Sequence, residues 1–365
     1  MAFLILFLFF SIPGRSLTIY STVTGGNWNA IGTWEGGQFP GATDDVIIRT
    51  GATVNTILGT YNTCNNLTVQ SGSTLVYNGS GTVVLTLNGS LTNNGTIKNG
   101  TGNLTLNIYQ NFSFQGTELS KYKITFLGTA NHSISFGVGK TFSGSYFYVE
   151  GTPRQLYSST SVSFTNSIVD FNGSTLLLAN DSALSIEGQS LSDIILTGTN
   201  NHLLMTGGSV LYNSTLTGST LHGTIRTGSG TINFNDLVTL TQGTTLENYG
   251  SSHIVYVNGS VINNGTITNT SNNLTLRITG NIFHNGIWNN YETSLSGTTD
   301  QEVTFGDGIY FAGSNFFSSN PTGKSIHFLS DVTFRGTFLN FAYGAGGSIR
   351  GNVLITDGKC LKVSG

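Results

Sequence analysis

The residues best suited to binding chemistry lie near the N-terminus, where Trp28 and Trp34 stand six residues apart among glycines. Tryptophan rings stack on sugars, so an exposed pair would form a carbohydrate contact. The alternative is a structural cap, because the end of a stacked β fold leaves its apolar core and its sheet edges open. A stacked fold needs such a cap in any case. We therefore favour the cap and keep a sugar contact at Trp28 and Trp34 as the second interpretation.

Groups that could hold a metal or transfer a proton are scattered along the chain. Asp44 and Asp45 could supply part of a Ca²⁺ site, but that ion takes roughly six to eight oxygen ligands. No third carboxylate follows at a fixed spacing, so we interpret the pair as turn residues before a strand. The histidines form no H-x-x-x-H pair, and we expect them to be solvated or at strand edges. They are His132, His202, His222, His253, His284 and His327.

The composition predicts many short strands. Charged residues make up 8% of the 365 residues, while 49 are glycine and only four are proline. Low charge, β-branched residues and frequent turn residues are typical of all-β folds. A net charge of -3 gives no attraction to nucleic acid. Cys64 and Cys360 lie 296 residues apart, and in an elongated fold they would be too distant for a disulfide, so we expect none within the chain.

An internal repeat dominates the sequence. Residues 88–111 and residues 258–281 align without a gap at a spacing of 170, and 15 of their 24 residues are identical. Matches continue on both sides with single-residue slips, which surface turns tolerate. We expect the two copies to have the same strands, with Leu104–Leu106 and Leu274–Leu276 on the same face of their coils.

Apolar-Thr-apolar triplets reveal the period within each copy. Their centres are 18, 19 and 20 residues apart, at Thr68, Thr86, Thr105 and Thr125. In a strand the two outer residues of a triplet share one face and the threonine faces the other way. Leu106→Asp should therefore lower the free energy of unfolding by a large amount, and Thr105→Asp should lower it little. Between strands, Asn93-Asn94-Gly95 and Asn263-Asn264-Gly265 should adopt positive φ.

These patterns predict an all-β protein, a right-handed parallel β-helix (β-solenoid) with coils of about 20 residues and an internal duplication of about 170 residues. Residues 1–16 resemble a secretory signal, with an apolar run too short to span a membrane; a buried first strand is the alternative. Residues 17–60 form the N-terminal cap and first strands. Residues 61–365 form the solenoid, with copies at approximately 67–170 and 237–340, and we expect it to continue beyond residue 365.

The N-terminal motif resembles a known class of proteins. Trp28, Trp34, Gly36-Gly37, Pro40 and Asp44–Ile48 follow a signal-like leader. This motif, and the strand repeats after it, is similar to the mature N-terminus of secreted surface proteins of Bacteroidetes. Those are adhesin-like right-handed β-helix proteins, usually exported by the type IX system. The resemblance implies an extracellular or cell-surface location. Such proteins commonly carry a C-terminal sorting domain, whereas this sequence ends within repeat-like residues, so we expect either that it is a fragment of a longer chain or that its export route is different.

Two functions follow as hypotheses. The first is an exported structural or adhesive β-solenoid of a bacterial cell surface, without catalysis or cofactor, whose partners are surface glycans or other cell-surface proteins. The second is a β-helix polysaccharide-degrading enzyme or carbohydrate-binding module. It would need a groove of aromatic and acidic residues, and the 17 acidic and 14 basic residues are spread singly along the sequence. The N-x-S/T triplets, which include Asn66, Asn78, Asn88 and Asn258, arise from composition rather than as glycan sites.

Overall fold

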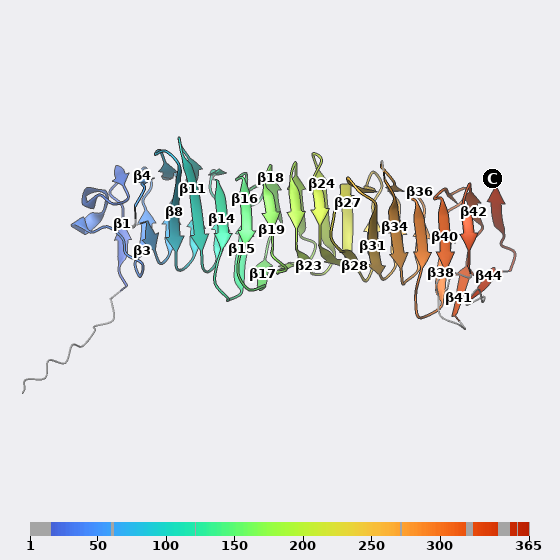
Figure 1. The fold of residues 1–365 in the computed structure, drawn as a ribbon. Helices are drawn as coiled ribbons and strands as arrows, with labels where there is room; N and C mark the ends of the chain where they lie inside the picture. The colour runs from blue at the N-terminus through green and yellow to red at the C-terminus, as the bar shows by residue number, and fades with distance from the viewer. Residues whose placement is uncertain are drawn as a thin grey trace, which may run out of the picture.

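The computed structural model describes residues 16–59, 62–120, 122–270, 272–318, 324–341, 351–355 and 357–364. The chain winds into a long rod, with its N-terminal coils at one end and its C-terminal coils at the other (Figure 1). Parallel strands stack from coil to coil through about 14 turns of about 21 residues. At ~4.8 Å per coil the rod is roughly 65 Å long. The predicted all-β solenoid is confirmed; the predicted signal segment, residues 1–16, lies outside the described residues except for Ser16.

Each turn contributes in order to three stacks of strands, which we call faces 1, 2 and 3. Face 1 is one continuous sheet of 16 strands. Its strands are β1 (Thr18–Tyr20), β3 (Asp45–Ile48), β6 (Leu67–Val69), β9 (Leu91–Asn93), β12 (Phe112–Phe114), β15 (His132–Phe136), β17 (Gln155–Ser158), β20 (Thr175–Leu178), β23 (Ile195–Thr197), β26 (Thr215–Thr217), β28 (Ile232–Asn235), β31 (His253–Asn258), β34 (Leu274–Ile278), β37 (Glu292–Leu295), β40 (Asn315–Ser318) and β43 (Phe338–Asn340).

Face 2 is interrupted once, where a single bridge between Phe142 and Phe164 replaces a strand. Before the interruption it contains β2 (Gly25–Asn27), β4 (Thr53–Thr56), β7 (Thr74–Tyr77), β10 (Thr96–Asn99) and β13 (Glu118–Ser120). After it come β18 (Val162–Thr165), β21 (Ala183–Glu187), β24 (Asn201–Thr206), β27 (Ser219–Thr227), β29 (Val238–Leu240), β32 (Val261–Asn263), β35 (Ile282–His284), β38 (Gln301–Phe305), β41 (Lys324–Phe328) and β44 (Gly351–Ile355).

Strand β27 belongs to both face 2 and face 3, because its first half pairs with β24 and its second half pairs with β25. The other strands of face 3 are β5 (Thr63–Cys64), β8 (Thr82–Leu87), β11 (Asn103–Ile108), β14 (Lys123–Phe126), β16 (Tyr146–Val149), β19 (Ile168–Asp170), β22 (Ser190–Ser192), β25 (Val210–Tyr212), β30 (Thr245–Asn248), β33 (Thr266–Thr268), β36 (Ile287–Asn289), β39 (Tyr310–Phe311), β42 (Val332–Arg335) and β45 (Leu361–Ser364).

Alternating burial fills the rod with one apolar core. The outer residues of each triplet point inward, and Leu104 and Leu106 are both fully buried. Aromatic rings from successive coils meet edge to face inside, as for Phe147 and Phe164, whose centroids lie 4.8 Å apart. Thr105, however, is only 7% exposed, so the expectation that it lies open to water is wrong. Its neighbours in the outward row, Val84 and Lys123, are large enough to cover it.

The two copies repeat the same strands, but on different faces. Leu104–Leu106 lies in β11 of face 3, whereas Leu274–Leu276 lies in β34 of face 1, so the expectation of a shared face is wrong. Coil length explains the shift, because it is not constant. Paired residues on face 1 are separated by 24 positions between Leu67 and Leu91, and by 17 between Leu276 and Thr293. A sequence repeat of fixed length therefore places equivalent residues on different faces of the rod.

Asn93 and Asn263 hold equivalent turns together from the inside. Both are fully buried, and their Oδ1 atoms accept hydrogen bonds from the backbone N–H groups of Gly95 (3.1 Å) and Gly265 (3.0 Å). The predicted positive φ is wrong for these turns: among the described non-glycine residues, positive φ occurs at Asn166, Asn172, Asp181, Asp193, Asn200, Asn213 and Asp236, and neither Gly95 nor Gly265 adopts it. Gly95 is needed for space instead, because a Cβ there would lie 2.4 Å from the carbonyl oxygen of Gln70.

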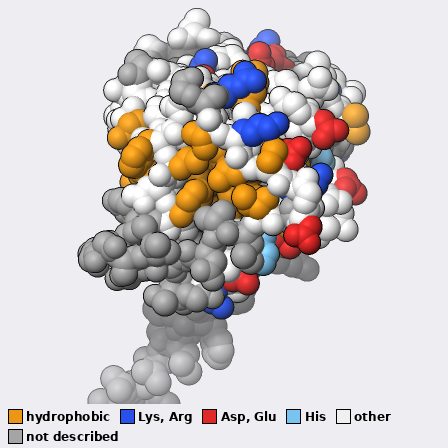
Figure 2. All heavy atoms as spheres, turned by 90° about the vertical axis from the view of Figure 1, so that its right-hand side faces the viewer, with side chains coloured by type: hydrophobic (Ala, Val, Ile, Leu, Met, Phe, Trp, Pro, Cys, Tyr) orange, Lys and Arg blue, Asp and Glu red, His pale blue; other side chains and the backbone are white. Residues whose placement is uncertain are grey.

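The two ends of the rod differ. At the C-terminal end, hydrophobic side chains gather in the centre of the end surface (Figure 2). Val363 and Ile355 continue inward rows by pairing with the buried Phe334 and Phe328, yet they are 58% and 42% exposed. At the N-terminal end the core is covered by the Trp28 and Trp34 region. Cys64 and Cys360, near opposite ends, are both free thiols, and burial raises the pKa of Cys64, with Asp45 and Asp44 adding to the shift.

Candidate functional site

The N-terminal tryptophans form part of the core. Trp28 and Trp34 are 0% and 2% exposed, and their rings meet edge to face at 5.2 Å. The indole Nε1 of Trp34 donates a hydrogen bond to the carbonyl oxygen of Trp28 (2.7 Å). Two short 3-10 helices, η1 (Ile31–Thr33) and η2 (Glu35–Gly37), fold this segment over the first coils. Neither ring offers an exposed face to a sugar, so burial favours the cap interpretation.

Asp44 and Asp45 tie neighbouring turns together. The carboxylate of Asp44 accepts hydrogen bonds from the N–H groups of Gly41 (2.9 Å) and Leu17 (3.1 Å). One oxygen of Asp45 accepts from the side-chain amides of Asn65 and Asn66, both at 2.8 Å. Asp44 thus closes the turn before β3, as expected, whereas Asp45 is the first residue of that strand. Within the described residues, no group of three or more His, Cys, Asp or Glu side chains is placed to hold a metal ion.

Two histidines contradict the expectation of solvated or edge positions. His284 is fully buried between Asn263 and the carbonyl oxygen of Tyr310, to which its Nε2–H donates (3.1 Å). Burial lowers the pKa of His284 to about 4. His132 is 3% exposed, and its Nε2 accepts a hydrogen bond from the Arg154 guanidinium (3.0 Å). Burial first, and then the charge of Arg154, lowers the pKa of His132. Both histidines are neutral core residues.

His202 and His222 form a separate pair on the outside of face 2. Their Nδ1 and Nε2 atoms lie 2.9 Å apart, and the second ring nitrogen of His222 lies 3.2 Å from the Thr241 hydroxyl. Burial and the neighbouring His202 lower the pKa of His222. The three side chains form one hydrogen-bonded chain along the rod. No carboxylate joins it among the described residues, so it lacks the partner that orients a catalytic histidine.

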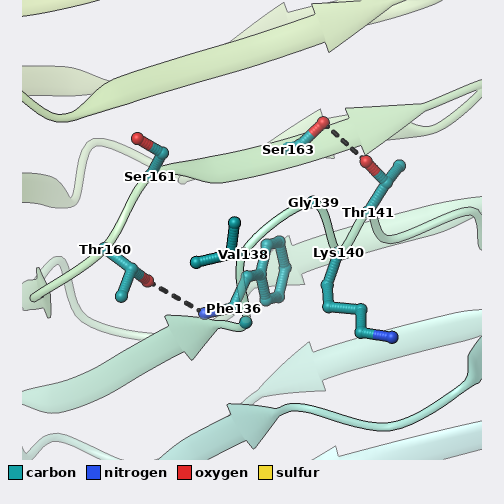
Figure 3. A pocket seen from close by; sticks show the side chains of 9 residues that line it. Phe136, Val138, Gly139, Lys140, Thr141, Thr160, Ser161 and Ser163 are labelled. Carbon is teal, nitrogen blue, oxygen red and sulfur yellow. Dashed lines mark hydrogen bonds between the residues drawn. The ribbon is translucent and has the colours of Figure 1, made fainter.

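A hollow of about 510 Å³ lies beside the interruption of face 2. The turn after β15 bulges outward there, and Val138 at its tip is fully exposed. Hydrogen bonds close the hollow on two sides, from Phe136 N to the Thr160 hydroxyl (3.1 Å) and between the hydroxyls of Thr141 and Ser163 (2.8 Å) (Figure 3). Lys140 is the only charged residue of its lining and points away from Thr160 in Figure 3. The lining offers no acid for catalysis.

A second hollow, of about 370 Å³, lies on the outside of face 1 across β31, β34 and β37. We call it the face 1 groove, and its lining residues are Tyr256, Asn258, Arg277, Thr279, Glu292, Ser294 and Ser296. Register places Tyr256, Arg277 and Ser294 in one outward row, one residue per coil. The Arg277 guanidinium lies 5.7 Å from the centre of the Tyr256 ring. Glu292 lies on the next outward row, paired with Thr275.

The charges of the face 1 groove are not paired with one another. Among the described residues, neither Arg277 nor Glu292 makes an ion pair or a side-chain hydrogen bond that would occupy its charged group. Arg226 and Glu247 on face 3, in contrast, form an ion pair, with their atoms 2.8 Å apart. The groove thus combines an exposed arginine and a half-buried glutamate, both with free hydrogen-bonding capacity, with hydroxyl and amide groups around them.

Sequence reasoning missed the face 1 groove because its residues lie in three different coils. A usable signal was present in the aligned copies. The first copy has Thr86, Asn107 and Lys123 where the second has Tyr256, Arg277 and Glu292. Alignment of the two copies therefore marks the positions at which the second copy carries an aromatic, a basic and an acidic side chain.

Comparison with known proteins gives no match: no family model fits the chain, and neither a curated protein nor a solved structure matches it. Within the described residues, no helix has the length and apolar character needed to cross a membrane. The functional argument therefore depends on the surface chemistry of the rod.

Proposed function

We propose that this chain is an exported structural and adhesive β-solenoid of a bacterial cell surface, with no catalysis of its own. The observation that carries the proposal is the row of small hydroxyl side chains on the outside of face 1. Register stacks Thr68, Thr92, Ser113 and Ser135 directly above one another, one per coil. The hydroxyls of Ser113 and Ser135 lie 3.2 Å apart. Such a row presents an uncharged donor and acceptor in four successive coils of the rod.

A second row of the same kind supports the proposal. On face 2 the register aligns Thr53, Thr74 and Thr96 before a charged residue, Glu118, ends the row. Repeated identical groups let many weak contacts act together, so affinity depends on multivalency rather than on one strong site. Uncharged rows also avoid the salt sensitivity of charge-based adhesion. Surface glycans, which carry hydroxyls at regular intervals, are partners that fit these rows, and the N-terminal resemblance to secreted surface proteins agrees with an exported location.

The test compares single and clustered forms of the chain from residue 17 to 365. Binding to a panel of immobilised neutral and acidic glycans is measured for the free protein and for the protein displayed on beads, with release of reducing ends followed in parallel. We expect weak binding by the free protein, a gain of about 10²–10⁴-fold on clustering, and no released ends. Turnover that is abolished by mutation of one acidic residue would overturn the structural interpretation and support an enzyme. Clustering without any gain would overturn adhesion.

A further inference from the structure

The face 1 groove differs from the hydroxyl rows because it combines an aromatic ring, a free cation and a free anion. Arg277 is exposed, and its guanidinium carries five N–H donors in a planar fork that matches a carboxylate. No described residue supplies that carboxylate, since no ion pair involves Arg277. The Tyr256 ring beside it adds an apolar surface. The position is therefore suited to an anionic group attached to a partly apolar ring.

Hydroxyl and amide groups line the groove on either side of Arg277. The Nδ2 of Asn258 donates to Asn235 Oδ1 (3.0 Å), which leaves Asn258 Oδ1 free to accept. The Thr279 hydroxyl makes only a long hydrogen bond to the Val257 carbonyl (3.4 Å). Glu292 is half-buried with its carboxylate free to accept from hydroxyl groups. These groups match the hydroxyls that flank a carboxylate on a sugar ring.

We propose that the face 1 groove binds an oligosaccharide that carries a sugar carboxylate, with the carboxylate on Arg277 and neighbouring hydroxyls on Glu292, Asn258 and Thr279. The volume of about 370 Å³ lies at the lower end of the range for small-ligand sites. Because the groove crosses three coils, it is about 10 Å long and open along the rod, which suits a linear chain. This inference refines the proposed adhesive function and rests on it.

The lining of the groove does not supply the groups needed to hydrolyse the ligand. Hydrolysis of a glycosidic bond uses two carboxyl groups, commonly about 5–9 Å apart. The lining contains one carboxylate, Glu292, and the arginine stays protonated and cannot serve as a base. Nucleic acid is an unsuitable ligand, because one arginine beside a glutamate neutralises no series of phosphates.

The test uses isothermal titration of the chain from residue 17 to 365 with trigalacturonate, and with sialyllactose as a second source of a sugar carboxylate. Trigalacturonate methyl ester and inorganic sulfate are the matched probes without the carboxylate and without the sugar. We expect binding of one or both acidic sugars, and at least tenfold weaker binding of the ester and of sulfate, as a lost charge-assisted hydrogen bond implies. Equal binding of the ester, or no binding of either acidic sugar, would overturn the proposal.

Variants assign the binding to the groove. Arg277→Asn and Tyr256→Thr introduce the residues that the first copy carries at the same positions, so both variants should fold. Arg277→Asn should weaken binding at least tenfold, and Tyr256→Thr several-fold. The control is Arg335→Asn, which removes another exposed arginine stacked on a tyrosine, Tyr310, at 3.8 Å. Equal affinity of Arg277→Asn and Arg335→Asn would overturn the site.

The two proposals fail in different ways. If clustered protein still adheres after Arg277→Asn, while no acidic sugar binds the unmodified chain, the adhesive function stands and the groove proposal falls. If a soluble acidic sugar binds through Arg277 but clustering adds nothing, the groove is a discrete ligand site and the adhesive proposal falls.

Discussion

The first and second copies of the internal repeat share a framework and differ in what they add to it. The same turns recur: the Asn99 side chain accepts from Leu104 N, and the Asn269 side chain accepts from Leu274 N, both at 2.8 Å. These bonds close the corner before the long strand of each copy. The copies differ both at outward positions and inside the core, where Phe114 corresponds to His284. The copies therefore share their turns and differ in the side chains that the strands carry.

The clearest difference inside the core is Phe114 in the first copy against His284 in the second. Both side chains are buried, and both pack edge to face against the following phenylalanine, Phe136 at 6.0 Å and Phe305 at 5.0 Å. The imidazole therefore occupies an aromatic position of the core. It differs from phenylalanine because it forms hydrogen bonds with Asn263 and the Tyr310 carbonyl and because it can take up a proton.

Outside the core, the difference is the face 1 groove. The row Thr86, Asn107 and Thr125 of the first copy corresponds to Tyr256, Arg277 and Ser294 of the second, with the same register between coils. A row of two threonines and an asparagine thus corresponds to a row with a ring and a charge. These differences lie in one outward row, and the register between coils is the same in both copies.

The largest expected effect tests whether the two frameworks are equivalent. Leu106→Asp and Leu276→Asp each place an unpaired carboxylate in the core, where the native leucines are 0% and 1% exposed. Each should lower the free energy of unfolding by on the order of 3–5 kcal/mol. Chemical denaturation of the two variants measures the costs. Thr92→Asp, at a half-buried outward position, is the control and should cost little. A large loss in one copy and almost none in the other would contradict equivalence.

The fold was largely predictable because inward rows leave a period in the sequence. The triplets placed Leu104, Leu106 and their counterparts inside correctly. The exposure of Thr105 was predicted wrongly because the residues that cover it, Lys123 and Val84, lie on adjacent strands. Local periodicity contains no information about neighbours on other strands. The change of face between copies was unpredictable for a similar reason, since it accumulates from unequal turns along the whole rod.

The candidate site was less predictable than the fold. The sequence singled out Trp28 and Trp34, with a cap favoured over a sugar contact, and the structure buries both. The groove residues Tyr256, Arg277 and Glu292 lie in three coils, and only the register of the strands brings them together. Each of these residues is a single position in its coil, and the sequence around it contains no motif. The alignment of the two copies identifies such positions, because the aligned residue of the first copy is different.

Acid should have an intermediate effect on the free energy of unfolding. This effect tests the difference between Phe114 and His284 in the core. Burial lowers the pKa of His284 to about 4 from its ordinary 6.5. Between these values the unfolded chain binds a proton that the folded chain refuses, so stability present above about pH 6.5 is lost as the pH falls to about 4. The loss from this residue is about 3 kcal/mol. Unfolding free energies measured from pH 7 to pH 4 should show it.

His284→Phe, which restores the first-copy residue, should remove that share of the acid sensitivity. Asn263 keeps a hydrogen bond from its amide to the Ile287 carbonyl (3.0 Å), so the substitution leaves no unpaired buried amide. The pKa values of His132, His222 and His253 are also lowered. The free energy of unfolding of the variant should therefore still decrease as the pH falls, but less steeply than that of the unmodified chain. Phe114→Tyr, at the equivalent position, is the control that changes the first copy without adding a titrating group in this range. An unchanged slope in His284→Phe would show that His284 does not carry the effect.

The smallest effect on stability, and the sharpest on binding, is expected from a graft of the groove into the first copy. Thr86→Tyr, Asn107→Arg, Tyr109→Thr and Leu127→Ser place the second-copy residues on the equivalent strands. All four positions are half-buried or exposed, so the free energy of unfolding should change by no more than about 1 kcal/mol. Lys123 is left in place because it forms an ion pair with Glu150 at 2.8 Å.

If register and outward side chains are sufficient for binding, the grafted chain should bind two molecules of the acidic sugar where the unmodified chain binds one. The stoichiometry from isothermal titration measures this directly. The second site should be the weaker one, since Lys123 replaces the acceptor that Glu292 supplies. Arg277→Asn in the grafted background should return the stoichiometry to one, with the remaining site in the first copy. A folded graft that still binds a single molecule would show that the hollow of face 1, and not its side chains alone, determines binding.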